Sequence, residues 1–96
     1  LEWNEKYFTK EITMQTEKHT LLNEFPDHHH TIRHLKMHDA HFTKLFNSYH
    51  EVEDEVHNLE KKNSPVEDEY LETLKKRRLQ LKDELYVMIQ KTEQAL

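Results

Sequence analysis

The strongest constraint on the fold is a pair of apolar repeats on either side of one short turn signal. Before the turn, side chains recur at alternating spacings of three and four, at Phe42, Leu45, Tyr49, Val52, Val56 and Leu59. After it, the same spacing runs through Leu71, Leu74, Arg78, Leu81, Leu85 and Met88. This heptad pattern is typical of helices that pack along a seam. It predicts two long helices, at about residues 40–62 and 65–93.

The segment between the repeats carries the signals that end one helix and begin another. Asn63 tolerates the left-handed conformation of a helix C-cap. Ser64 and Glu67 have the spacing of a capping box, and Pro65 falls at the first helical position. Because so short a connection makes neighbouring helices antiparallel, we expect a helical hairpin.

Arg78 is the one charged member of the predicted seam. An antiparallel hairpin folded about residue 63 places Arg78 opposite Tyr49. Its methylenes can pack in the seam while the guanidinium lies over the Tyr49 ring or reaches solvent. The same register brings an acidic group near a basic one: Glu51, Glu53, Asp54 and Glu55 near Lys75, Lys76 and Arg78.

A shorter helix is expected ahead of the hairpin, at about residues 26–37. Pro26 suits its first turn, and Ile32 and Leu35 give it an apolar edge. We expect a bend near His38, with Asp39 capping the next helix. A continuous helix through Asp39 is the alternative. The last helix should extend far enough to bring Tyr86 and Ile89, near its end, against this edge.

Residues 1–24 show no dominant pattern. Their apolar side chains fit both a poor helix and a short strand, and they are Trp3, Tyr7, Phe8, Ile12 and Met14. We expect a frayed or weakly helical N-terminal arm, with a helix that docks Trp3 and Phe8 as the alternative. The predicted fold is thus all-α: an antiparallel helical hairpin with a short preceding helix, forming a domain over residues 25–96.

Composition excludes several classes of function. The 96 residues include no Gly and no Cys, so glycine-rich phosphate loops, disulfides and thiolate sites are excluded. The net charge of −5 argues against a general nucleic-acid binder, and no apolar run is long enough to span a membrane. No pair of carboxylates is placed in a cleft, and neither Ser48 nor Ser64 has a visible base. We therefore expect no enzymatic activity and no cofactor.

Two clusters offer alternatives to a purely structural role. On a helix, His30, His34 and His38 line one face and could bind Zn²⁺, Ni²⁺ or Cu²⁺ through imidazole, although a solvated histidine face is the simpler interpretation. Protonation near pH 6 would make that face positive.

The basic run of residues 75–78 with Lys82 could hold phosphates. We expect the acidic helix beside this run to pair with it, and no specific nucleic-acid binding.

A second apolar stripe predicts self-association. Leu79 and Tyr86 lie away from the seam, Ile89 lies between the two stripes, and Phe46 is off the seam of the preceding helix. A single hairpin cannot cover both stripes, and monomers rarely leave such a patch exposed. We expect a homodimer about a two-fold axis, with these four residues at its interface.

Several motifs resemble the small bacterial YdcH-like family. They are His41-Phe42, Leu45-Phe46, Tyr49-His50-Glu51-Val52 and the Leu-Lys-Lys-Arg-Arg-Leu-Gln-Leu-Lys-Asp-Glu-Leu run of residues 74–85. The resemblance covers about residues 25–90. It implies a short coiled-coil-like protein, cytoplasmic and self-associating, with no catalytic residues to transfer. The function expected is association with itself or with a partner helix; a histidine-rich module that responds to metal or pH is the alternative.

Overall fold

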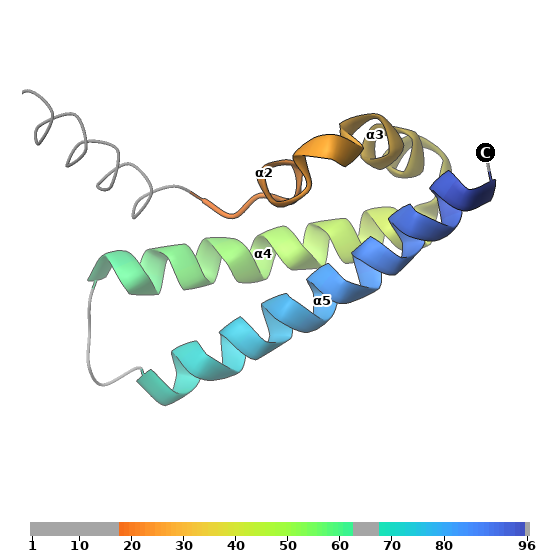
Figure 1. Cartoon of the computed structure of the whole chain (residues 1–96). Helices are drawn as coiled ribbons and strands as arrows, with labels where there is room; N and C mark the ends of the chain where they lie inside the picture. Colours follow the sequence, from red (N-terminus) through yellow and green to blue (C-terminus); the bar gives the residue numbers. More distant parts are fainter. Residues whose placement is uncertain (1–17, 63–67, 96) are drawn as a thin grey trace, which may run out of the picture.

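The computed structural model describes residues 18–62 and 68–95, and every regular element in these two ranges is helical. The order is α2 (Leu21–Glu24), the 3₁₀ helix η1 (Pro26–His28), α3 (His29–His38), α4 (Ala40–Lys62) and α5 (Asp68–Ala95). Helices α4 and α5 run antiparallel as a hairpin, and the segment from α2 to α3 lies along one side of it (Figure 1). The all-α fold and the helical hairpin are therefore confirmed.

The observed helices can be compared with the expected ones directly. The helix expected at about 26–37 comprises η1 and α3, and the one expected at about 40–62 is α4. The helix expected at about 65–93 is α5, which continues to Ala95. The predicted capping box of Ser64 and Glu67 lies outside the described residues, as do Asn63 and Pro65.

Asp39 separates α3 from α4, as the sequence predicts. Its backbone is extended, with φ −127° and ψ 106°, which interrupts the helix. Its carboxylate oxygen Oδ1 accepts a hydrogen bond from the Phe42 backbone N–H at 2.9 Å. Because this bond satisfies an N–H with no partner inside α4, Asp39 is the N-cap of α4. The alternative of a continuous helix is wrong.

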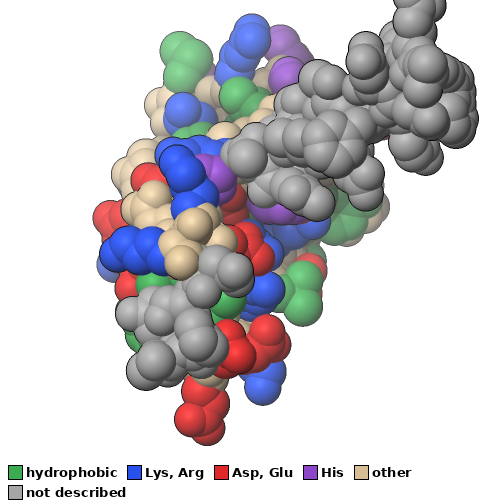
Figure 2. Space-filling view, turned by 90° about the vertical axis from the view of Figure 1, so that its left-hand side faces the viewer, with side chains coloured by type: hydrophobic (Ala, Val, Ile, Leu, Met, Phe, Trp, Pro, Cys, Tyr) green, Lys and Arg blue, Asp and Glu red, His purple; other side chains and the backbone are tan. Residues whose placement is uncertain are grey.

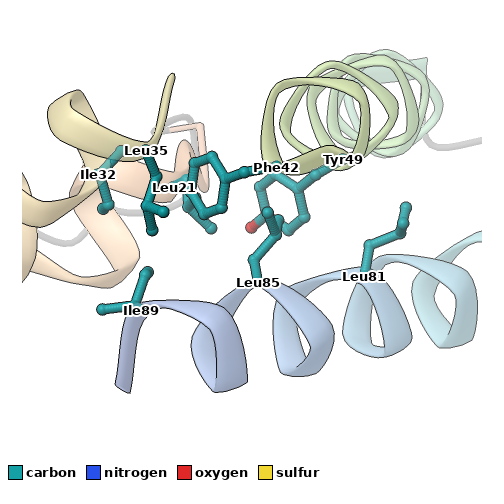
Figure 3. Packing of buried hydrophobic residues seen from close by; sticks show 8 residues of the cluster. All are labelled: Leu21, Ile32, Leu35, Phe42, Tyr49, Leu81, Leu85 and Ile89. Carbon is teal, nitrogen blue, oxygen red and sulfur yellow. The ribbon is translucent and has the colours of Figure 1, made fainter. Parts of the chain in front are cut away.

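The core lies where the hairpin meets the preceding segment. Eight buried side chains form one cluster, shown in Figure 3: Leu21, Ile32, Leu35, Phe42, Tyr49, Leu81, Leu85 and Ile89. They come from α2, α3, α4 and α5. Ile89 therefore packs with Ile32 and Leu35, which closes the open end of the hairpin as expected.

The structure corrects the expected boundary at residue 25. Thr20 caps α2 by accepting from the Asn23 backbone N–H at 3.2 Å, and Leu21 is fully buried in the core. Lys18 and His19 also bond to α4. Residues 18–24 therefore belong to the folded domain rather than to a frayed arm. The earlier aromatic residues Trp3, Tyr7 and Phe8 lie outside the described residues.

Candidate functional site

The predicted seam is unevenly buried along the hairpin. Five of its members are fully buried: Phe42, Tyr49, Val56, Leu81 and Leu85. The remaining members are half-buried: Leu45, Val52, Leu59, Leu71, Leu74, Arg78 and Met88. Leu59 lies in the last turn of α4, and Leu71 and Leu74 lie in the first two turns of α5. Helices α2 and α3 lie along another part of the hairpin (Figure 1).

A buried ion pair crosses the hairpin between an acidic and a basic residue that the predicted register brings near each other. The Arg78 guanidinium donates to Glu53 Oε1 at 2.6 Å rather than lying over Tyr49. The Glu53 side chain is 1% exposed and that of Arg78 is 20% exposed. Since a buried carboxylate is costly without a partner, the Glu53 charge depends on this contact.

Glu53 also holds the segment that precedes α2. Its second oxygen, Oε2, accepts from the His19 backbone N–H at 2.6 Å, while the Tyr49 hydroxyl donates to the His19 carbonyl at 2.6 Å. Both polar groups of the His19 backbone are therefore bonded to α4. The sequence places Glu53 near Arg78 together with three other acidic residues, and nothing local distinguishes the one that is buried.

His50 makes a further connection between α4 and α2. Its Nδ1–H donates to the Phe46 carbonyl at 2.9 Å, and its Nε2 accepts from the Leu21 backbone N–H at 3.2 Å. A carbonyl can only accept and an amide N–H can only donate, so these two bonds define the neutral tautomer of the ring. His50 is thus a structural histidine that fixes the start of α2.

Glu24 ties the other end of α2 to α5. It bonds to Lys82 Nζ at 2.7 Å and to His19 Nδ1 at 3.2 Å. Partial burial raises the pKa of Glu24, but the bonds to Lys82 and His19 lower it by more, so the pKa lies below its ordinary value. Burial, followed by the negative charges of Glu24 and Glu53, raises the pKa of the Tyr49 phenol.

Most of the basic run is paired with carboxylates of neighbouring elements. Lys75 lies 3.2 Å from Glu60, and Arg78 and Lys82 bond to Glu53 and Glu24 as described above. Lys76 and Arg77 are exposed. On the side of the molecule nearest the turn, basic and acidic side chains lie interspersed (Figure 2). The basic run therefore does not form a uniformly positive surface on this side of the described molecule.

The histidines of η1 and α3 are divided between structural contacts and solvent. His28 Nδ1 lies 2.7 Å from Glu93 Oε2, which also accepts from the Thr31 hydroxyl, and these two bonds lower the pKa of Glu93. Of the candidate ligands, His30, His34 and His38 are exposed, and the rings of His34 and His38 have centroids 4.6 Å apart. Within residues 18–62 and 68–95, no group of three or more His, Asp or Glu side chains is arranged to hold a metal ion.

The four residues expected at a dimer interface differ in how far they are exposed. Ile89 is fully buried within the chain, so it is not available to a partner. Tyr86 is half-buried and stacks on Phe25 with ring centroids 5.1 Å apart. Phe46 is half-buried beneath the Lys36 ammonium, which lies 4.3 Å from its ring. Leu79 remains 57% exposed on the outer face of α5.

The sequence predicts the packing of Ile89 against Ile32 and Leu35, but it does not predict that residues 18–24 help to cover the second stripe, because it places residues 1–24 in an arm. Phe25 and Leu21 supply the apolar surface that the second stripe needed. The sequence held one usable signal: Thr20 precedes two leucines, as an N-cap precedes a helix. Of the four residues of the expected interface, Leu79 is therefore the one that stays exposed.

Comparison with known proteins gives one family. A family model described as "Protein of unknown function (DUF465)" matches residues 42–89, which span most of α4, the turn and most of α5. No curated protein and no solved structure matches the chain. None of the described helices is both long and apolar enough to cross a membrane.

Proposed function

Because the family match covers half of the chain, this chain belongs to the DUF465 family, and on that premise we propose that it is a non-enzymatic protein that acts by self-association. The proposed form is a homodimer of helical hairpins. The YdcH-like relationship, a bacterial origin and a cytoplasmic location are parts of the same proposal.

The exposure of Leu79 carries this proposal. A leucine that is 57% exposed in the middle of a long helix loses apolar contact with water when a second helix packs on it. Leu59, Leu71 and Leu74 support it, since they are only half-buried where α4 and α5 are the only described elements. Bundles of four helices bury such residues by joining two hairpins.

The polar side chains favour a structural role over a catalytic one. The buried carboxylate of Glu53 is bonded to Arg78 and to a backbone N–H, and Glu24 and Glu93 each have two partners. These groups serve to hold elements together. A general acid or base needs a free position for the proton it transfers, so we assign none of them a catalytic role.

Light scattering after size exclusion at about 100 μM protein tests the proposal, since this concentration exceeds the dissociation constant of typical specific complexes. We expect a dimer, and a monomer for Leu79→Glu. Met37→Glu is the matched control, because Met37 is 78% exposed but lies on α3, away from Leu79. A monomeric wild type at this concentration would contradict the proposal.

A further inference from the structure

The outer face of α5 carries a short strip of three exposed side chains with a definite order of charge. Lys76, Leu79 and Asp83 are spaced three and four apart, so they share one face of the helix. In the described parts of the chain, neither Lys76 nor Asp83 has a hydrogen bond or an ion pair, whereas Lys75, Arg78 and Lys82 all have carboxylate partners. Along α5 the strip therefore runs from a basic residue through an apolar one to an acidic one, and neither charged side chain has an ion-pair partner among the described residues.

We infer that this strip is the dimer contact, and that α5 packs there antiparallel to α5 of a second copy with the two-fold axis at Leu79. This inference rests on the proposed self-association and specifies its geometry. A two-fold interface uses the same patch on both chains, so the patch must be complementary to itself. A strip with opposite charges on either side of a leucine satisfies that condition.

The spacing along the helix fits an antiparallel pair. Lys76 lies about 4.5 Å before Leu79 along the axis and Asp83 about 6 Å after it, at 1.5 Å per residue. Rotation about an axis through Leu79 therefore brings Lys76 of each chain beside Asp83 of the other, giving two ion pairs around a leucine contact. A parallel pair would instead oppose lysine to lysine and aspartate to aspartate, which is repulsive.

The contacts between α2 and α5 lie beside the strip, and one of them neutralises the charge of Lys82. Helix α2 and Phe25 occupy the adjacent side of α5, through the Glu24–Lys82 ion pair and the stacking of Phe25 on Tyr86. In the antiparallel arrangement Lys82 would approach Lys76 of the second copy. Because Glu24 holds the Lys82 ammonium at 2.7 Å, its charge is directed toward α2 and is neutralised there.

Charge reversal with mixing tests this arrangement. Lys76→Glu places two acidic groups together across the axis, and Asp83→Lys places two basic groups together. We expect each variant alone to dissociate, with the dissociation constant raised roughly tenfold or more, since like charges across an interface are strongly unfavourable. In an equimolar mixture of the two variants, a heterodimer opposes the introduced glutamate to the introduced lysine at one contact and keeps the native pair of Lys76 with Asp83 at the other, so it should form. The double variant Lys76→Glu/Asp83→Lys should again dimerise with itself.

Two controls distinguish loss of this contact from loss of folding, and the possible outcomes distinguish this dimer geometry from self-association in general. Arg77→Glu reverses an exposed charge adjacent to Lys76 but off the strip, and it should remain a dimer. Circular dichroism of each variant checks that the helices are retained. Dimers formed equally well by the wild type and both single variants would overturn the inference and leave self-association standing. Single variants that are folded and monomeric but do not combine on mixing would also overturn it. A monomeric wild type would overturn both.

Discussion

At the scale of single residues, Glu53 is a buried carboxylate that joins separate segments of the chain. It is buried in α4, and it bonds to Arg78 of α5 and to the His19 backbone ahead of α2. Three segments therefore meet at one carboxylate. Asp54, the next residue, pairs with Lys18 while both side chains are about half exposed. Two adjacent residues of α4 therefore form one buried ion pair, Glu53 with Arg78, and one exposed ion pair, Asp54 with Lys18.

Glu53→Ala should lower the free energy of unfolding by about 2–4 kcal/mol, because it leaves the guanidinium of Arg78 and the His19 N–H without an acceptor. The exposure of Arg78 places this value somewhat below that of a fully buried pair. Asp54→Ala is the matched control and should cost at most about 1 kcal/mol, since water screens its ion pair. Urea denaturation at one protein concentration measures both. Equal losses would mean that Glu53 is not buried as described.

The pH dependence of stability follows from Glu24 and Tyr49. The pKa of Glu24 is lowered in the folded chain, so its contribution is present above the ordinary value of 4.5 and is lost as pH falls through the folded value. The pKa of Tyr49 is raised, so its contribution is complete below 10.0 and is lost as pH rises above that value. We expect the urea midpoint to decline as the pH falls below about 4.5 and as it rises above about 10. Glu24→Gln should weaken the acid decline and Tyr49→Phe the alkaline one; unchanged profiles would contradict the assignment.

At the scale of elements, α2 is short but decisive for the core. Four residues cannot form a stable helix alone, so α2 depends on its Thr20 cap, on Leu21 in the core and on the bonds from Glu24 to Lys82 and from the Leu21 backbone to His50. It covers the part of α5 that the hairpin leaves open. The preceding segment is therefore an integral layer of the domain.

Leu21→Ala should cost roughly 2–5 kcal/mol of unfolding free energy, because it opens a cavity at a fully buried position. Leu22→Ala removes a neighbouring leucine that is only partly buried, and it should cost less. Hydrogen exchange would show whether faster exchange in the Leu21 variant is concentrated in residues 18–25. A loss as small for Leu21 as for Leu22 would contradict the docking of α2.

At the scale of the whole molecule, the domain combines a well-covered end with a thinner one. Toward the end of α5, the segment from α2 to α3 covers the hairpin seam. Toward the turn, α4 and α5 are the only described elements that contribute, and their leucines are half-buried. If dimerisation buries this region, assembly and stability must be linked.

The melting temperature of the wild type should therefore rise with protein concentration between about 5 and 500 μM, a range that brackets micromolar dissociation constants. Differential scanning calorimetry over this range measures the effect. Leu79→Glu should remove the concentration dependence while it retains a cooperative transition at the lower temperature. A wild-type melting temperature independent of concentration would argue against a dimer linked to folding.

Zinc ions provide a separate test at the same scale. Since no described group of side chains is arranged to hold a metal, we expect a tenfold excess of Zn²⁺ to shift the melting temperature by less than about 2 °C. His34→Ala/His38→Ala is the control for weak surface binding. A large stabilisation by Zn²⁺ that this double variant abolishes would favour the metal-responsive alternative.

The local features of the fold could be predicted from the sequence because their signals are local. Heptad spacing identified the two long helices, and Asp39 was recognised as the cap between α3 and α4. Spacing also identified Leu79 as an off-seam residue, which the structure leaves exposed. These features depend on side chains within one or two helical turns of each other.

Only the tertiary structure decided which residues share an environment across segments. Glu53 has the same sequence signature as its acidic neighbours, and it is buried because Arg78 and the His19 backbone converge on it. Tyr86 and Ile89 were expected at a dimer interface, yet Phe25 and the core of the same chain cover them. Periodicity states which face of a helix is apolar, but the free energy of burial depends on area removed from water and not on which segment removes it. The choice between a partner chain and residues 18–25 therefore required the fold itself.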